Sequence, residues 1–439
     1  MRGKKRGVLC GFLFFLSGVL VIQGYLFPIG RHSVAVGEPL KLNFPAPIER
    51  NLKARIHQGQ DSLLKFNSNT SAQVITLDSD PVAAEPGQIQ MRLSLFGLIP
   101  LKDMVVSIVP QINVIPGGQS IGVLLHSQGV VVMGHSAVED PAGNKVNPAV
   151  DAGICDGDII LKIDAEDIKS EGQVRDMVAR AGTSGQPLEL EVKRGEEIFF
   201  TKIIPVYCKD NLRYRIGLFV RDNAAGLGTL TYYEPESMTY GALGHIITDA
   251  GTEQPIELSD GRIVGASVQA IHRGKRGQPG EKIGIFQNDK QFNGTITRNT
   301  RMGIFGYLQQ LPVNANFAAP IPVAMANQIH EGPAEVLTVL NEDKVDKFTV
   351  EILKLNLQAE QEGKGMIIKI TDQRLLEQTG GIIQGMSGSP IIQEDKLVGA
   401  ITHVFVNDPT KGYGVPAEWM LREAGMLHEE KEINVNKAS

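Results

Sequence analysis

Apolar and polar residues alternate along much of the chain, and this pattern predicts strands rather than helices. The alternation is clear over residues 87–110, and short apolar runs follow at 228–235, 261–271 and 365–372. Turn-forming residues separate these runs at the spacing of about 8–12 residues that is typical of barrels. We therefore expect a mainly β protein in which residues 211–420 form two β-barrels.

The first thirty residues break this pattern. An apolar run over residues 8–27 follows four basic residues: Arg2, Lys4, Lys5 and Arg6. A run of about 20 apolar residues can span a bilayer as a helix, and basic residues before it keep that end in the cytoplasm. No clear small-residue cleavage site follows. Residues 1–30 are therefore predicted to be a retained signal anchor or transmembrane segment, with a cleaved signal peptide as the alternative.

The rest of the chain divides into four segments. They are a membrane-proximal β region at 31–112, a mixed unit at 113–207, a β-rich unit at 208–425 and a polar tail at 426–439. The 48 glycines and 23 prolines favour short strands and turns. The net charge of −6 argues against a general nucleic-acid binder.

Cysteine usage indicates neither a metal site nor a disulfide framework. Cys10 lies in the apolar N-terminal run, and Cys155 and Cys208 lack the spacing of either arrangement. We expect Cys155 and Cys208 to be free thiols, and we expect no metal and no other cofactor.

The stretch GMSGSPIIQEDKLVGAITH, residues 385–403, places two serines among small residues before an apolar strand. Its glycines can serve a tight turn, or they can clear space so that a serine hydroxyl and backbone N–H groups reach a substrate carbonyl. A nucleophilic serine needs a base, usually histidine. The candidates are His245, His272, His330 and His403. His245 is favoured because it lies well upstream of the serines, as in chymotrypsin-like enzymes.

Residues 113–207 resemble a PDZ domain of the bacterial protease-associated type. The most specific part, PAVDAGICDGDIILKIDAEDI at 148–168, is similar to the PDZ pattern of a small-residue helix, a Gly-Asp turn and an apolar strand. In such domains the backbone N–H groups of a glycine-containing loop receive a peptide carboxylate. The resemblance places this loop at Gly117, Gly118, Ser120, Ile121 and Gly122. The alternative is that these glycines only form tight turns.

The chain also resembles the stage IV sporulation protein B family of serine peptidases. The resemblance lies in GALGHIITD, in the PDZ-like segment and in the run from Gly380 to Val415, and it covers nearly the whole chain, anchor included. It implies a trypsin-like double β-barrel with a catalytic triad of His245, Asp372 and Ser387. It places the oxyanion hole at the backbone N–H groups of Gly385 and Ser387.

The serine assignment can be checked against the motif itself. GMSGSP compares with GDSGGP of trypsin-like enzymes, and Pro390 follows Ser387 by the same three positions, which favours Ser387 over Ser389. Met386 replaces the aspartate that receives a newly cut N-terminus in trypsins. Activation by that route is therefore not expected.

The carboxylate assignment is more open. Asp372 lies only 15 residues before Ser387, whereas trypsins take their carboxylate from the earlier barrel. Asp249, four residues after the favoured histidine, and Asp408 are alternatives, and each of the three can also be a solvated turn residue.

The family resemblance implies an exported endopeptidase that acts between the forespore and mother-cell membranes. Its protein substrate would be a regulator like stage IV sporulation protein FA, which restrains an intramembrane metalloprotease, so that cleavage signals activation of a mother-cell sigma factor. The family also implies self-processing, which we expect in the chain's own N-terminal region, where residues 67–73 are polar. The alternatives are a general envelope quality-control protease and a non-catalytic PDZ scaffold.

Overall fold

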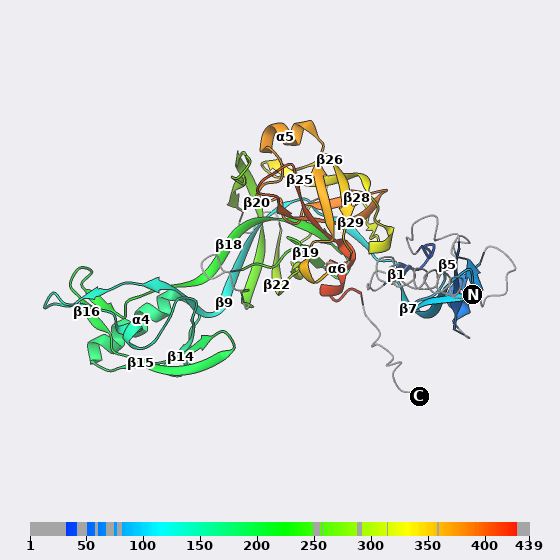
Figure 1. Cartoon of the computed structure of the whole chain (residues 1–439). Coiled ribbons are helices and arrows are strands. Elements are labelled where there is room, and N and C mark those ends of the chain that lie inside the picture. The colour runs from blue at the N-terminus through cyan, green and yellow to red at the C-terminus, as the bar shows by residue number, and fades with distance from the viewer. Residues whose placement is uncertain are drawn as a thin grey trace, which may run out of the picture.

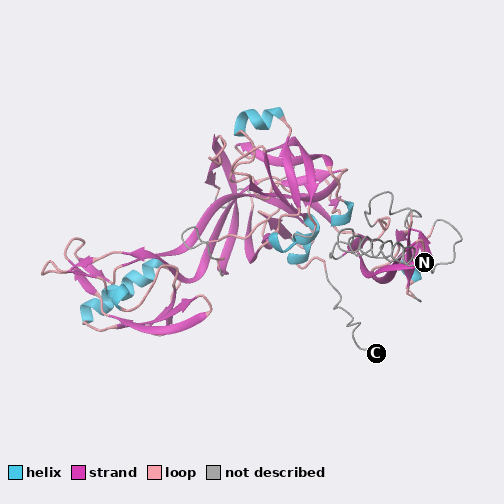
Figure 2. Ribbon diagram, in the orientation of Figure 1, coloured by secondary structure: helices cyan, strands magenta, loops and turns pink. Residues whose placement is uncertain are grey.

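The computed structural model describes residues 32–41, 51–57, 60–66, 74–76, 81–248, 255–256, 258–287, 292–313, 315–357 and 360–427. This part of the chain is mainly β, as predicted, and forms an N-terminal sheet, two barrels and a PDZ-like unit (Figures 1 and 2). No helix in these ranges is long and apolar enough to cross a membrane. The predicted anchor at 1–30, the polar segment 67–73 and residues 428–439 of the predicted tail lie outside the described residues.

The N-terminal sheet has five strands in the order β1-β7-β6-β2-β4. They are β1 (His32–Ala35), β2 (Leu52–Ile56), β4 (Val74–Thr76), β6 (Gly87–Leu95) and β7 (Ile99–Val109), and β3 (Leu64–Lys65) pairs separately with β5 (Val82–Ala83). Alternation explains β2, in which Leu52, Ala54 and Ile56 are buried and the two basic residues between them are exposed. Contacts join this region to the second barrel, because Lys396 Nζ lies 2.7 Å from Glu38 Oε1.

The first barrel closes with six strands in the order β9-β20-β22-β23-β19-β18, because β18 also pairs with β9. They are β9 (Ser120–His135), β18 (Leu218–Tyr233), β19 (Thr239–Ala242), β20 (Leu258–His272), β22 (Asn293–Thr300) and β23 (Gly303–Leu308). At its side, β8 (Asn113–Pro116) pairs with β18 and β24 (Ile321–Pro322), and β21 (Glu281–Phe286) pairs with β20.

The second barrel is also closed and has six strands in the order β25-β26-β27-β30-β29-β28. They are β25 (Gly332–Asn341), β26 (Lys344–Leu355), β27 (Met366–Ile370), β28 (Pro390–Gln393), β29 (Lys396–Val404) and β30 (Lys411–Pro416). Two short helices belong to this barrel, α5 (Gln373–Thr379) and α6 (Ala417–Glu423). The two barrels together give the double-barrel architecture predicted from the sequence.

The PDZ-like unit is inserted into the first barrel. Ile121 of β9 pairs with Gly228 and Gly265 inside the barrel, while Val131 farther along the same strand pairs with Ile159 of the PDZ-like sheet. Figure 1 shows β9 and β18 running together from the barrels into the PDZ-like unit. The strand pairing therefore divides the chain differently from the predicted boundaries at 113 and 207, because a strand's alternation is the same whichever sheet it joins.

The inserted unit packs one longer helix against its own sheet. Its main elements are α3 (Pro148–Asp151), β12 (Ile159–Ile163), β13 (Glu166–Asp167), α4 (Glu171–Ser184), β14 (Leu188–Arg194), β15 (Glu197–Ile203), β16 (Val206–Cys208) and β17 (Arg213–Arg215), with a small β10 (Val138–Glu139) and β11 (Lys145–Val146) hairpin. Ser170 caps α4 by accepting the N–H of Gln173, and Gly185 ends the helix in a left-handed conformation.

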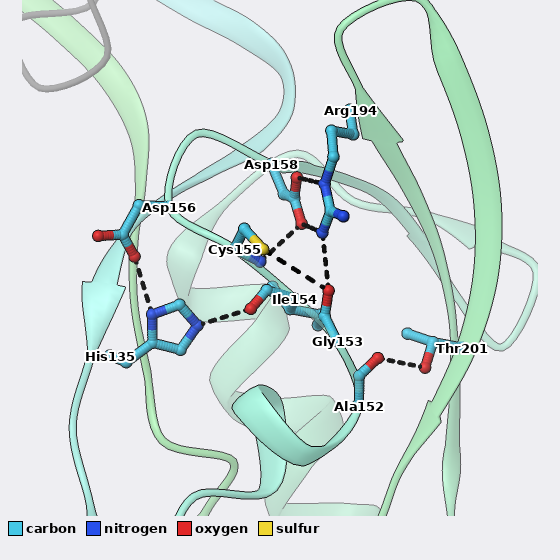
Figure 3. A network of polar contacts seen from close by, with 9 residues as sticks. All are labelled: His135, Ala152, Gly153, Ile154, Cys155, Asp156, Asp158, Arg194 and Thr201. Carbon is cyan, nitrogen blue, oxygen red and sulfur yellow. Dashed lines mark hydrogen bonds and ion pairs between the residues drawn. The ribbon is translucent and has the colours of Figure 1, made fainter.

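Polar contacts fix the Gly-Asp turn that the sequence singled out (Figure 3). Arg194 Nε and Nη2 each donate over 2.7 Å to the carboxylate of the buried Asp158, which also accepts the Cys155 N–H. The same guanidinium donates to the Gly153 carbonyl over 2.7 Å. His135, at the end of β9, contacts Asp156 of this turn at 2.8 Å. This network is structural, since it joins the turn to β14 and β9.

Candidate active site

The turn before β28 carries the predicted nucleophile, Ser387. Gly385 and Gly388 adopt φ of 89° and 93°, which side chains rarely tolerate. A Cβ at Gly388 would also lie 2.1 Å from the Thr229 carbonyl oxygen, so only glycine fits there. Met386 is fully buried, and its carbonyl accepts the Ser389 N–H over 2.9 Å. The turn is therefore held rigidly in one conformation.

Two buried threonines of β18 bind the back of this turn. Thr229 donates its N–H to the Ser387 carbonyl over 2.9 Å and its hydroxyl to the Gly385 carbonyl over 2.7 Å. Thr231 donates its hydroxyl to the Gly388 carbonyl over 2.8 Å. We did not predict these residues from the sequence. The signal in the sequence was weak, although polar side chains that are buried in a strand need hydrogen-bond partners.

The neighbouring peptide groups carry the predicted oxyanion hole. The Gln384 carbonyl accepts the Lys282 N–H over 3.0 Å and the Met386 carbonyl accepts the Ser389 N–H over 2.9 Å, while the N–H groups of Gly385 and Ser387 in these two peptide groups have no hydrogen-bond acceptor within the described part of the chain. Paired, unoccupied donors beside a nucleophile are what stabilisation of an oxyanion requires.

Ser387 and His245 line the same pocket, which has a volume of about 650 Å³ and contains residues of both barrels. The Ser387 hydroxyl donates to the Thr402 carbonyl over 2.6 Å. His245 Nδ1 lies 2.8 Å from the Ile246 carbonyl, which can only accept, so Nδ1 carries the proton. In the neutral ring Nε2 is then the free acceptor, the form that a general base needs. Burial lowers the pKa of His245 from its ordinary value of 6.5.

A third residue, Asn299 of β22, holds the segment that carries the histidine. Its Oδ1 accepts the Ile247 N–H over 2.9 Å, and its Nδ2 donates to the Ile247 carbonyl over 2.9 Å and to the Ile256 carbonyl over 3.2 Å. Sequence reasoning missed it, since nothing in the chain near Asn299 marks it as a partner of His245.

His403 also lines the pocket, and its ring centroid lies 4.9 Å from that of His245. Partial burial, followed by repulsion from His245 and Lys364, lowers the pKa of His403 to about 4. Both rings are therefore neutral near pH 7. The other two histidine candidates are occupied elsewhere: His272 and His330 contact Glu281 and Glu394.

The structure does not bring Asp372 to His245. Asp372 caps α5, and its carboxylate accepts hydrogen bonds from the N–H groups of Arg374 and Thr349 and from the Arg374 guanidinium at 2.8 Å. Bonding to Arg374 lowers its pKa to about 2. This local helix cap and ion pair keep the side chain outside the pocket.

Neither of the two alternative aspartates is seen to contact His245 in the described structure. Asp408 bonds to Thr410 at 2.6 Å and to Lys411 at 3.0 Å, and Asp249 lies outside the described residues. No aspartate or glutamate is present among the described residues that line the pocket. In the described structure, the Ile246 carbonyl is the group that orients the His245 ring.

Ser389 belongs to a buried network behind the turn. Its hydroxyl donates to Thr338 Oγ1 over 3.2 Å, and Lys282 Nζ donates to the same oxygen over 2.9 Å. Ser389 is fully buried and does not line the pocket, whereas Ser387 does. Burial lowers the pKa of Lys282 to about 7. The geometry thus supports Ser387 rather than Ser389 as the nucleophile.

The structure places the predicted carboxylate-binding loop inside the first barrel. Gly117 and Gly118 donate their N–H groups to the carbonyls of Thr231 and Leu230 over 2.8 Å. Ser120, Ile121 and Gly122 belong to β9, which is paired on both edges. These N–H groups are therefore used within the sheet, and the prediction of a peptide-binding loop here was wrong. The motif was misassigned because β9 runs on into the PDZ-like unit.

Comparison with known proteins gives two family matches. Residues 212–421 match the model described as SpoIVB peptidase S55, and residues 120–203 match the PDZ domain model. No curated protein matches the chain. Among solved structures, the PDZ domain of the SdrC-like protein from Listeria monocytogenes is 25% identical and covers 21% of this chain and 87% of its own, with a TM-score of 0.17.

Proposed function

Since the chain is a SpoIVB-like serine peptidase with a PDZ domain, we propose that it is an exported signalling endopeptidase of sporulation. Proteins are its substrates. We propose that its substrate is a regulator resembling stage IV sporulation protein FA. Cleavage of this regulator would release an intramembrane metalloprotease and so activate a mother-cell sigma factor. We place it in the space between the forespore and mother-cell membranes, attached by residues 1–30. The signalling role rests on the family, and the chemistry rests on the site.

The observation that carries the chemistry is the pocket shared by Ser387 and His245 beside two unpaired N–H groups. The substrate carbonyl oxygen points toward the N–H groups of Gly385 and Ser387. Ser387 Oγ attacks the carbonyl carbon, and His245 Nε2 accepts the hydroxyl proton. The Ser387 hydroxyl first turns away from the Thr402 carbonyl that it contacts at 2.6 Å.

Completion of the reaction uses the same groups. The protonated His245 gives its proton to the leaving amine, and the acyl chain stays on Ser387 as an ester. Water then attacks this ester, with His245 again acting as base. The Ile246 carbonyl, which accepts from Nδ1, keeps the ring in its productive tautomer through both steps.

Self-processing is part of the proposal. The N-terminal sheet is joined to the peptidase by the Glu38–Lys396 ion pair at 2.7 Å and by the hydrogen bond from Arg422 to Ser33 at 3.1 Å. A segment on the same chain as the catalytic groove meets it at a high effective concentration wherever the connection lets it reach. The polar segment 67–73 is the part of the region in which we expect the cut.

The test uses full-length wild-type and Ser387→Ala proteins, each incubated with the regulator and with an unrelated unfolded protein, followed by mass mapping of fragments. The proposal predicts cleavage of the regulator at one or a few sites by the wild type alone. Rapid cleavage of the unfolded protein at many sites would instead indicate a quality-control protease. An inert wild-type protein that also fails to react with a serine-directed probe would indicate a scaffold.

Self-processing is tested by mixing the two proteins. Shortened wild-type chain beside full-length Ser387→Ala chain indicates cutting within one molecule. If both chains stay intact while the regulator is cleaved, self-processing is not part of the mechanism.

A further inference from the structure

We infer that the subsite beside Ser387 takes an apolar side chain, so that the enzyme cuts after apolar residues and rejects basic ones. This inference rests on the proposed endopeptidase activity and adds the substrate class.

The position of the subsite follows from the turn. A carbonyl held at the N–H groups of Gly385 and Ser387 has its own Cα one bond away, so its side chain must lie against the walls beside the turn. One wall is the segment that leads directly into Gly385, residues 382–384. The other is the end of β29, where Thr402 and Val404 line the same pocket.

The walls of this subsite are mainly apolar, and Gln384 and Thr402 are their polar members. Ile382 and Ile383 approach it from the turn, Val404 from β29 and Leu243 from the first barrel. Ile382 and Ile383 are only 2% and 1% exposed, so packing fixes them in place. A Cβ on Gly412 would lie 2.7 Å from Ile382 Cδ1, which shows that Ile382 packs directly onto β30. The subsite is therefore preformed, and β30 closes it behind Ile382.

No group among the described residues that line the pocket can neutralise a basic substrate side chain. Among the described residues that line the pocket there is no carboxylate, and Arg221 is the single lysine or arginine. Arg221 would repel a basic side chain, and so would Lys364, whose charge acts on His403. His245 and His403 are uncharged near pH 7, because both have lowered pKa values. A lysine side chain would lose its hydration here without gaining a partner.

The test begins with reduced, denatured β-casein, digested by the full-length enzyme, and with mass mapping of the new termini. The most rapidly cleaved site is then made as a short peptide in two forms, with norleucine or lysine as the residue that supplies the scissile carbonyl. These side chains have the same length and differ in the terminal charged group. The inference predicts a kcat/KM at least about tenfold higher for the norleucine peptide.

A designed change of specificity gives the second arm. Val404→Asp places a carboxylate at the edge of the subsite, and Val404→Asn is the matched control of similar size without charge. The aspartate variant is expected to shift the lysine-to-norleucine ratio of kcat/KM by at least about tenfold relative to the asparagine variant. Val404 is chosen because it is only partly buried, and circular dichroism verifies that both variants fold.

Binding separates this inference from the proposed activity. The two peptides are titrated onto Ser387→Ala protein by fluorescence anisotropy, which needs no turnover. If the wild type leaves β-casein intact, the endopeptidase is refuted, and the subsite assignment is still tested by titrating a fixed pair of acetylated peptide amides, Ala-Ala-norleucine and Ala-Ala-lysine, onto the Ser387→Ala protein. Cleavage or binding that is equal for the two peptides, or that favours lysine, would overturn the inference.

Discussion

Thr229 donates its backbone N–H to the carbonyl of Ser387 over 2.9 Å, so a strand of the first barrel holds the nucleophile of the second. The hydroxyl of Thr229 holds the Gly385 carbonyl in the same way at 2.7 Å. Each bond fixes a peptide group near the predicted oxyanion hole. The two barrels therefore complete one site together, and β18 holds the peptide groups next to those that carry the predicted oxyanion N–H groups.

Thr229→Val tests this dependence. Valine keeps the shape of the side chain but leaves the buried Gly385 carbonyl without its donor, which costs about 1–3 kcal/mol of stability. We expect kcat to fall by about 10–100-fold with little change in KM, because loss of a whole oxyanion donor costs about 100–1,000-fold. Thr229→Ser keeps the hydroxyl and should recover most of the activity. Equal kcat values for the wild type and the valine variant would show that the turn is rigid without this bond.

Asp372→Asn distinguishes a helix cap from a catalytic carboxylate. In the structure Asp372 contacts Arg374 and Thr349 and caps α5, so the main expected loss is about 1 kcal/mol of stability. We expect kcat/KM to stay within about threefold of the wild type at a temperature where both are folded. Peptide hydrolysis and thermal unfolding are measured in parallel. A loss of several orders of magnitude in kcat at unchanged stability would restore Asp372 as the partner of His245.

The pH profile reports on His245 directly. The ring must be neutral to accept the serine proton, so activity is lost as the pH falls through its pKa. Burial lowers this pKa from 6.5, so the acid limb of kcat/KM should have its midpoint below pH 6.5. A carboxylate bonded to the ring would favour the imidazolium and raise the midpoint. A midpoint near pH 7 or above would therefore indicate that a carboxylate contacts His245, in contradiction to the described pocket lining.

Lys282 makes stability depend on pH. Burial lowers its pKa from 10.5 to about 7 in the folded protein. Between these values the unfolded chain holds a proton that the folded chain has released, so the free energy of unfolding rises with pH, by at most about 1.4 kcal/mol per unit. Lys282→Met should remove this rise and be more stable than the wild type near pH 7. Urea unfolding at about pH 7 and about pH 9 compares the two slopes. Identical slopes would show that Lys282 is charged in the folded state.

The sequence predicted the mainly β double-barrel architecture, and it singled out Ser387 and His245, which the structure places in one pocket and whose catalytic roles stay predictions. Alternation along β25 to β30 predicted a barrel, and the small residues around Ser387 predicted the nucleophile turn. His245 followed from its place upstream of the serine. These features depend on local residue patterns and on the order of residues along the chain, and both can be read from the sequence.

Other features depend on pairing that a sequence does not display. β9 and β18 alternate continuously, so nothing in their residues marks where the barrel ends and the PDZ domain begins. This is why Gly117 and Gly122 were assigned to a binding loop. Asp372 was assigned to the catalytic site for a related reason. The sequence does not show that its carboxylate binds Arg374, two residues away, and so does not contact His245. Thr229 and Asn299 contact residues more than fifty positions away, and only the fold reveals them.

The central claim, that Ser387 is the nucleophile, is tested most directly by a serine-directed fluorophosphonate probe. Wild-type, Ser387→Ala and Ser389→Ala proteins are labelled, the labelled peptide is mapped by mass spectrometry, and peptide cleavage is measured on the same samples. We expect Ser387→Ala to lose all labelling and to lose cleavage by several orders of magnitude. Ser389→Ala should keep both, because its hydroxyl is buried against Thr338. Labelling and cleavage that survive in Ser387→Ala but vanish in Ser389→Ala would contradict the account.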